Sequence, residues 1–308
     1  MTVLGEALAG YLDLRRGLGF TLERDAKLLA QFIAYLEETE AATITTANAL
    51  AWATLPAGGS PGWLRMRMTV VRGFAAYLCT LDPSAEVPPA GLLPGRTRRA
   101  VPYLYSGADI AALLTQADRL KTPLRRATIK TLIGLMAVTG MRGGEVVALD
   151  DEDFDPGRGL LLVRHAKLGK HRLLPLHRST VAALLDYRRL RDRRFPRRVS
   201  PALLVSSAGT RLLYYNVGVT FARLARRAGL AGRSGGCRPR PHDLRHSFAV
   251  ATLLDWCRDG ADIASRLPLL SAYLGHADPA STYWYLHATP ELLAEAARRP
   301  GPGPGEPR

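Results

Sequence analysis

The chain has 308 residues, 47% of them hydrophobic, which predicts two domains with sizeable cores and excludes a largely disordered protein. Its 42 lysines and arginines outnumber 27 acids and give a formal charge of +15, which favours nucleic acid over an anionic membrane as the partner. The sequence shows no signal peptide and no apolar run long enough to span a bilayer. Its three cysteines, Cys79, Cys237 and Cys257, lack the spacing of metal ligands, so we expect a cytoplasmic protein with reduced thiols.

Residues 1–82 are predicted to form an N-terminal domain of four helices. Leucines and aromatic residues recur at helical spacing over residues 4–14 and again over residues 28–36, and a shorter helix begins near Asn48. Ser60-Pro61 combines a capping residue with a proline at the first helical position, and so starts the fourth helix. Three arginines alternate with the apolar positions of that helix and predict a basic side: Arg65, Arg67 and Arg72.

Residues 83–102 are predicted to be a linker between domains. Prolines stiffen this segment, and three arginines near its end would let it lie along a phosphate backbone: Arg96, Arg98 and Arg99. A solvated connector without a binding role is the alternative interpretation.

The second predicted domain covers residues 103–298 and mixes helices with a few short strands. Two apolar runs separated by Lys167–Lys170 predict a β-hairpin, and residues 201–206 are expected to add a third strand. Helical patterns lie over residues 106–117, 124–138, 181–194, 217–228 and 244–256. The Gly/Pro-rich residues 299–308 are expected to be a disordered tail. The predicted fold class is therefore mainly α with a small β-sheet.

Six residues of types suited to phosphodiester chemistry follow one another along the chain: Arg142, Lys167, His242, Arg245, His276 and Tyr285. Arginine has a planar fork of donors that suits the non-bridging oxygens of a phosphate. Histidines donate hydrogen bonds or move a proton near neutral pH. A tyrosine is a weak nucleophile that needs a cationic pocket and a base. The set predicts a site that attacks a phosphodiester with a phenol and without a metal.

The local contexts of these residues resemble the tyrosine recombinase (phage-integrase-type) family. Thr139–Glu145 resembles its first-arginine box, Pro241–Phe248 its histidine–x–x–arginine box, and Leu274–His276, with a tyrosine nine residues later, its third box. Lys167 lies in the hairpin where the family keeps a lysine, although Leu168 replaces the usual glycine. The resemblance implies a helical core-binding (SAM-like) N-terminal domain and a mixed α/β catalytic domain that together clamp double-stranded DNA.

The resemblance also implies a mechanism. Tyr285 would attack the scissile phosphate and form a 3′-phosphotyrosyl bond, while Arg142 and Arg245 hold the non-bridging oxygens. His242 and His276 would assist, and Lys167 would protonate the leaving 5′-oxygen. Neither ATP nor a metal nor another cofactor is required, because the phosphotyrosyl bond conserves the energy of the phosphodiester.

Some neighbouring residues compete for or support these roles. Tyr283 is the alternative nucleophile, and Lys170 and Arg172 are alternative hairpin cations that we otherwise expect to contact DNA. Glu145, three residues after Arg142, is expected to hold that arginine in place. His246 lies four residues after His242, but a zinc site there is disfavoured because no glutamate follows the first histidine as in the metalloprotease motif.

One protomer supplies one nucleophile and the exchange of two duplexes needs four cuts, so we expect a homotetramer on DNA. Companion recombinases of a mobile element are further expected partners, and the expected location is the cytoplasm, at the nucleoid. Two alternatives stay open: a type IB topoisomerase-like enzyme, and a catalytically inactive DNA-binding accessory protein. An RNA-binding or membrane-surface protein would explain the charge but not the sequence boxes.

Overall fold

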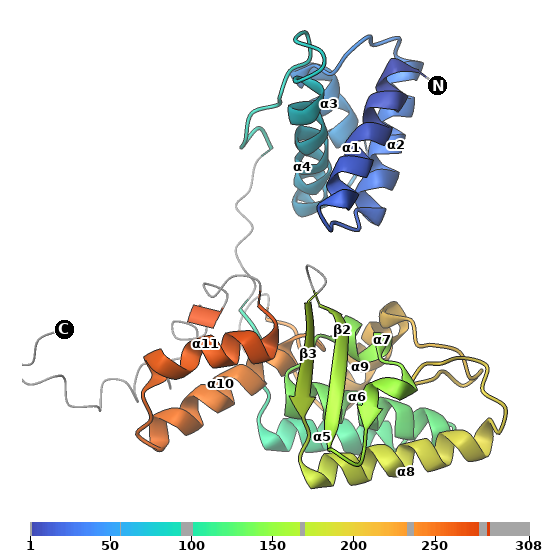
Figure 1. The fold of residues 1–308 in the computed structure, drawn as a ribbon, viewed down its shortest axis with the longest axis vertical. Helices are drawn as coiled ribbons and strands as arrows, with labels where there is room; N and C mark the ends of the chain where they lie inside the picture. The colour runs from blue at the N-terminus through green and yellow to red at the C-terminus, as the bar shows by residue number, and fades with distance from the viewer. Residues whose placement is uncertain are drawn as a thin grey trace, which may run out of the picture. The chain divides into compact units, whose positions relative to one another are not determined.

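The structure is a computed structural model that describes residues 2–55, 57–93, 101–166, 170–232, 237–276 and 282–283. Several predicted residues lie outside the described part of the chain: Lys167, Tyr285, Arg96, Arg98 and Arg99, together with the side chain of Lys170. The chain divides into two compact units, Met1–Arg99 and Ala100–Arg308 (Figure 1).

The N-terminal unit consists of the four predicted helices, α1 (Val3–Gly17), α2 (Glu23–Glu38), α3 (Thr46–Thr54) and α4 (Pro61–Leu78). Ser60 caps α4 as expected, since its hydroxyl accepts a hydrogen bond from the backbone N–H of Trp63. The apolar stripe of α2 is buried throughout in the core of this unit. In α1 the predicted stripe is wrong at Leu14, which is 53% exposed because it lies two residues, about 200° around the helix, from buried Leu12.

The predicted basic side of α4 requires a correction. Arg67 is only 7% exposed, donates from Nη2 to the carbonyl of Trp52 at 2.7 Å, and stacks its guanidinium 3.6 Å from the centre of that indole ring. Arg67 therefore joins α4 to α3 inside the unit and does not lie on an exposed basic side of the helix. Arg72 donates to the carbonyls of Pro88 and Pro89, and the DNA contacts of Arg65 and Arg72 stay predictions.

Helix α6 runs through the middle of the second unit, in contact with α5, α8 and α10 (Figure 1). Its side chains Leu132, Ile133 and Met136 are fully buried in the core. The described helices of this unit are α5 (Gly107–Ala117), α6 (Pro123–Thr139), α7 (Gly143–Ala148), α8 (Arg178–Arg194), α9 (Tyr214–Arg227), α10 (Asp243–Arg258) and α11 (Ile263–Leu274). The sequence predictions miss α11, which contains Pro268 although proline removes a helical hydrogen bond.

An antiparallel sheet of order β1-β2-β3 accompanies these helices, formed by β1 (Phe154–Asp155), β2 (Leu160–Ala166) and β3 (Lys170–Pro175). The predicted hairpin is confirmed in β2 and β3, but the third strand predicted over residues 201–206 is wrong. That segment forms only isolated bridges, and its apolar side chains fill the core. The fold is mainly α with a small sheet, as predicted. None of the described helices has the length and apolar character needed to cross a bilayer.

Candidate active site

The first arginine stands where α6 ends in a tight turn. Gly140 terminates that helix with φ of +61°, and a Cβ there would lie 2.5 Å from Phe248 Cδ1, so the turn needs glycine. Arg142 follows in extended conformation as the N-cap residue of α7. The tight packing of α6 on α10 thus places Arg142 beside the start of α10.

Glu145 fixes Arg142 in the way the sequence predicts. Its Oε1 accepts from Arg142 Nη1 at 2.9 Å, and its Oε2 accepts from the Arg142 backbone N–H at 2.9 Å. Arg142 Nη2 also donates to the carbonyl of Gly275 at 3.1 Å. The guanidinium is therefore held on two sides while the side chain stays partly exposed.

Arg245 lies on the first turn of α10 and is only 1% exposed. It donates from Nη1 to the carbonyl of Gly140 at 2.9 Å and from Nη2 to the carbonyl of Leu274 at 2.7 Å. The start of α10 is itself anchored by Asp243, a buried first-turn acid that pairs with Arg240 at 2.9 Å. Arg142 and Arg245, more than a hundred residues apart in sequence, thus bind adjacent carbonyls of one turn.

That turn carries His276. Gly275 ends α11 with φ of +67°, and the imidazole Nδ1 of His276 lies 2.7 Å from Thr282 Oγ1. Burial, followed by Arg245, Arg142 and other nearby cations, lowers the pKa of His276 to about 4. The ring is therefore neutral at physiological pH.

His242 is the N-cap residue of α10, and its ring packs edge-on against His246 with centroids 4.9 Å apart. Burial and then the charge of Arg245 lower the pKa of His242 below its ordinary value. Both predicted histidines are therefore neutral near pH 7, able to donate one hydrogen bond and to accept one proton.

Arg172 is the residue whose place the sequence analysis misjudged. Its side chain is 11% exposed, and its Nη2 and Nη1 donate to Glu145 Oε2 and Oε1 at 2.8 and 3.2 Å. A Cβ on Gly275 would lie 2.7 Å from Arg172 Nη1, so the guanidinium packs directly on the turn that carries His276. Arg172 is therefore not a solvated hairpin cation but part of an arginine cluster with Arg142 and Arg245, and its contact with DNA stays a prediction.

Strand alternation offered a signal for this placement. Arg172 and Leu174 are two residues apart and so share one face of β3, and Leu174 is fully buried.

Glu145, the carboxylate that Arg142 and Arg172 share, keeps its charge. Burial acts to raise the pKa of Glu145, but hydrogen bonds from Arg172 and Arg142 outweigh burial and hold the pKa below its ordinary value.

The structure thus brings Arg142, His242, Arg245 and His276 together, and adds Arg172 and Glu145. Lys167 and Tyr285 lie outside the described residues, whereas the alternative nucleophile Tyr283 is described and is 49% exposed. Fixed guanidinium groups beside neutral imidazoles have the chemistry needed to bind the oxygens of an anion and to accept a proton. Within the described residues, no group of three or more side chains could hold a metal ion.

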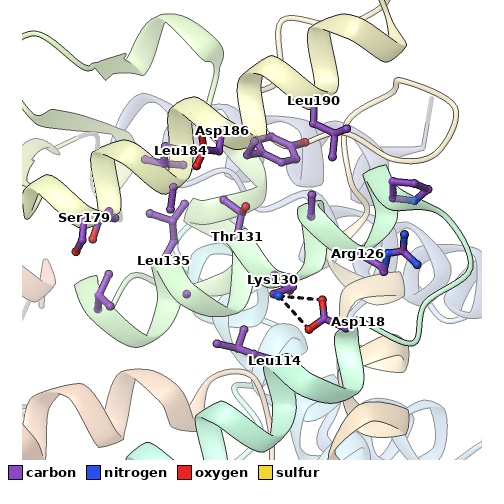
Figure 2. Close-up of a pocket in the computed structure, with 17 residues that line it drawn as sticks. Leu114, Asp118, Arg126, Lys130, Thr131, Leu135, Ser179, Leu184, Asp186 and Leu190 are labelled. Atoms are coloured by element: carbon purple, nitrogen blue, oxygen red, sulfur yellow. Dashed lines mark hydrogen bonds and ion pairs between the residues drawn. The ribbon is translucent and has the colours of Figure 1, made fainter.

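A separate groove of about 670 Å³ lies between α6 and α8, beside the end of α5 (Figure 2). Aliphatic side chains such as Leu114, Leu135 and Leu190 line it, and Lys130 pairs with Asp118 at 2.8 Å on its wall. It contains no histidine and none of the predicted catalytic residues. The groove therefore lacks the groups that the predicted chemistry needs.

Comparison with known proteins identifies the family of this chain. Residues 106–291 match the model of the phage integrase family. The chain is 42% identical over 97% of both lengths to y4rB of Sinorhizobium fredii (strain NBRC 101917 / NGR234), whose name describes an integrase/recombinase. It is 32% identical to tyrosine recombinase XerC of Azotobacter vinelandii (strain DJ / ATCC BAA-1303), over 77% of this chain and 73% of that one.

The fold agrees with a solved structure as well. The Tn1549 transposon integrase in complex with transposon right end DNA superposes with a TM-score of 0.63 at 16% identity, covering 95% of this chain and 98% of that one. With the family model matching more than half of its length, the chain belongs to the phage integrase family, the tyrosine recombinases.

Proposed function

We propose that this protein is a site-specific DNA recombinase that cleaves and rejoins strands through a 3′-phosphotyrosyl intermediate. One observation carries the proposal: Arg142 and Arg245 converge on the carbonyls of Gly275 and Leu274, beside neutral His276. Fixed positive charge of this kind stabilises the charge that gathers on the non-bridging oxygens in the transition state. Membership of the recombinase family and the similarity to a transposon integrase support integration, excision or transposition of a mobile element.

The proposed reaction assigns a role to each residue. The Tyr285 phenol oxygen attacks phosphorus, and its proton passes to neutral His242, while His276 donates a hydrogen bond to a non-bridging oxygen. The bond between phosphorus and the 5′-oxygen breaks, and Lys167 donates a proton to that oxygen. A 5′-hydroxyl of the partner strand then gives its proton to Lys167 and attacks the phosphotyrosyl phosphorus, and the released Tyr285 oxygen takes its proton back from His242. No net oxidation or hydrolysis occurs, so the step is reversible.

The assembly belongs to the same proposal. A helical core-binding domain of residues 1–82 and a catalytic domain of residues 103–298 would hold one duplex, joined by the linker of residues 83–102. Four protomers would act together on two duplexes in the cytoplasm, alone or with companion recombinases. The basic charge of +15 supports an extensive phosphate contact.

Covalent trapping tests the proposal. Wild-type protein is incubated, without metal, with duplexes that carry the ends of the encoding element and a nick beside the cleavage point, so that the adduct accumulates. We expect a protein–DNA adduct on denaturing gels that disappears in Tyr285→Phe and persists in Tyr283→Phe. The reverse pattern would move the nucleophile to Tyr283. Tight binding of DNA by the wild-type protein without any adduct would refute the proposed strand-cleavage activity and favour an accessory DNA-binding protein.

A circular substrate separates the recombinase from the topoisomerase. A plasmid with two copies of the element's junction is expected to give recombinant products that depend on Tyr285. Relaxation of supercoils without recombinant products would instead assign the protein to type IB topoisomerase-like chemistry.

A further inference from the structure

Thr282 is a fully buried residue whose hydroxyl contacts the active-site imidazole. Its Oγ1 lies 2.7 Å from His276 Nδ1, and its exposed fraction is 0%. In the sequence it stands six residues after His276 and three residues before Tyr285. Neither the sequence boxes nor the proposed reaction gives it a role.

The contact matters because His276 is neutral. A neutral imidazole carries one proton, on Nδ1 or on Nε2, and the nitrogen without it presents a lone pair. Phosphate oxygens only accept hydrogen bonds, so the nitrogen that faces the phosphate must carry the proton to help it. The hydrogen bond at the other nitrogen decides which tautomer forms.

The hydroxyl of Thr282 can donate the hydrogen bond that selects the tautomer of His276. A threonine hydroxyl donates one hydrogen bond, and His276 Nδ1 lies within hydrogen-bond distance of it. When the hydroxyl donates, Nδ1 must be unprotonated and the ring proton must reside on Nε2. The opposite arrangement, in which Nδ1–H donates to Thr282, would turn a lone pair toward the anionic substrate.

We propose that Thr282 is a positioning residue that donates its hydroxyl proton to Nδ1 of His276 and keeps the imidazole in its Nε2–H tautomer when DNA is bound. This inference rests on the proposed function, in which Nε2–H donates to a non-bridging oxygen of the scissile phosphate. Because Thr282 precedes Tyr285 by three residues, the same hydrogen bond ties the imidazole to the segment that leads to the nucleophile.

Nitrogen NMR reads the tautomer directly. Histidine is labelled with ¹⁵N in the Tyr285→Phe protein, which is bound to uncleaved DNA, and the His276 signals are identified by their loss in His276→Gln. We expect an unprotonated Nδ1 and a protonated Nε2, and a mixture of tautomers after Thr282→Val. A protonated Nδ1 in the protein that retains Thr282 would overturn the inference, whatever the variants do.

Single-turnover adduct formation gives the second readout. Thr282→Val keeps the shape but removes the hydroxyl, so we expect a rate about tenfold lower, the effect of one hydrogen bond. Thr282→Ser keeps the donor and is expected to stay close to the wild-type rate. Thr128→Val is the matched control, since Thr128 is also buried but bonds to Tyr187 and Val205 away from the site.

The possible failures are distinguishable. If wild type forms no adduct, the proposed function fails. If wild type forms the adduct and Thr282→Val reacts at the same rate with an unchanged spectrum, the recombinase stands and the role of Thr282 is wrong. A rate loss in Thr282→Val that Thr128→Val matches would also overturn the inference, because loss of a buried hydroxyl would then explain both.

Discussion

The ion pair between Arg172 and Glu145 gives a sharp test of the arginine cluster. Both side chains are about nine-tenths buried, and two hydrogen bonds join them. Arg172→Met leaves Glu145 with Arg142 as its remaining cation, and Glu145→Gln removes the charge that both arginines share. Breaking a buried pair costs about 3–5 kcal/mol, and since Glu145 keeps one partner we expect Arg172→Met to cost about 3 kcal/mol.

A double-mutant cycle in the full-length protein measures this coupling. The free energy of unfolding is obtained from urea denaturation for Arg172→Met, Glu145→Gln and the double variant. Because each residue acts largely through the other, the double variant is expected to cost less than the two single costs added together, by at least about 1 kcal/mol. Adduct formation should fall as well, since Arg142 loses the carboxylate that fixes its guanidinium.

An exposed ion pair supplies the control. Arg258 and Asp255 pair at 3.3 Å, but each side chain is about two-thirds exposed. Arg258→Met should therefore change the free energy of unfolding by less than about 1 kcal/mol. If Arg172→Met cost no more than Arg258→Met, the cluster would not be the tightly coupled unit described above, and the reasoning would be refuted.

Three further changes have expected outcomes. Arg245→Lys removes the fork that spans two carbonyls, so adduct formation should fall about 10²–10³-fold while gel-shift binding of DNA persists; an unimpaired rate would exclude Arg245 from the reaction. Because the folded pKa of His276 and that of His242 lie below the unfolded value near 6.5, the unfolded chain binds more protons below that pH. Stability to urea should therefore fall as the pH drops from about 6.5 toward 4, and a flat profile would contradict neutral imidazoles. Arg67→Gln should destabilise the N-terminal unit by about 1–3 kcal/mol, whereas Arg65→Gln should weaken DNA binding and reduce its salt dependence; equal effects would contradict their different burial.

Local patterns predicted the elements of the fold well where the signal was periodic. The stripe of α2 from Leu28 to Leu36 is buried as expected, and Ser60 caps the helix that it precedes. The strand predicted over residues 201–206 was wrong because an apolar run fills a core in either conformation. Helix α11 was missed although its apolar residues Leu267, Leu270 and Leu274 are buried at helical spacing around Pro268.

The site was predictable as a set of residues but not as a network. The sequence boxes drew attention to Arg142, Arg245 and His276, and local spacing predicted the contact of Glu145 with Arg142. The position of Arg172 was not predicted, because its partner Glu145 lies 27 residues away and Gly275 follows only after helices α8 to α11. A basic residue near a hairpin tip is expected to be solvated unless it is known to lie on the buried face of its strand. Arg67 was misjudged for the same reason, since its partner Trp52 belongs to another helix.

The turn at Leu274 and Gly275 is the point at which the three arginines of the site meet. Arg142 binds the carbonyl of Gly275, Arg245 binds that of Leu274, and Arg172 packs on the Cα of Gly275. A side chain at position 275 would both strain a backbone at φ of +67° and collide with Arg172, so glycine there lets three cations meet. Glu145 neutralises only one of the two arginines that it binds, which leaves their shared site positively charged. Repulsion among these arginines lowers the stability of the free protein. The same positive charge is complementary to an anionic phosphodiester, so the arrangement favours binding of the proposed substrate.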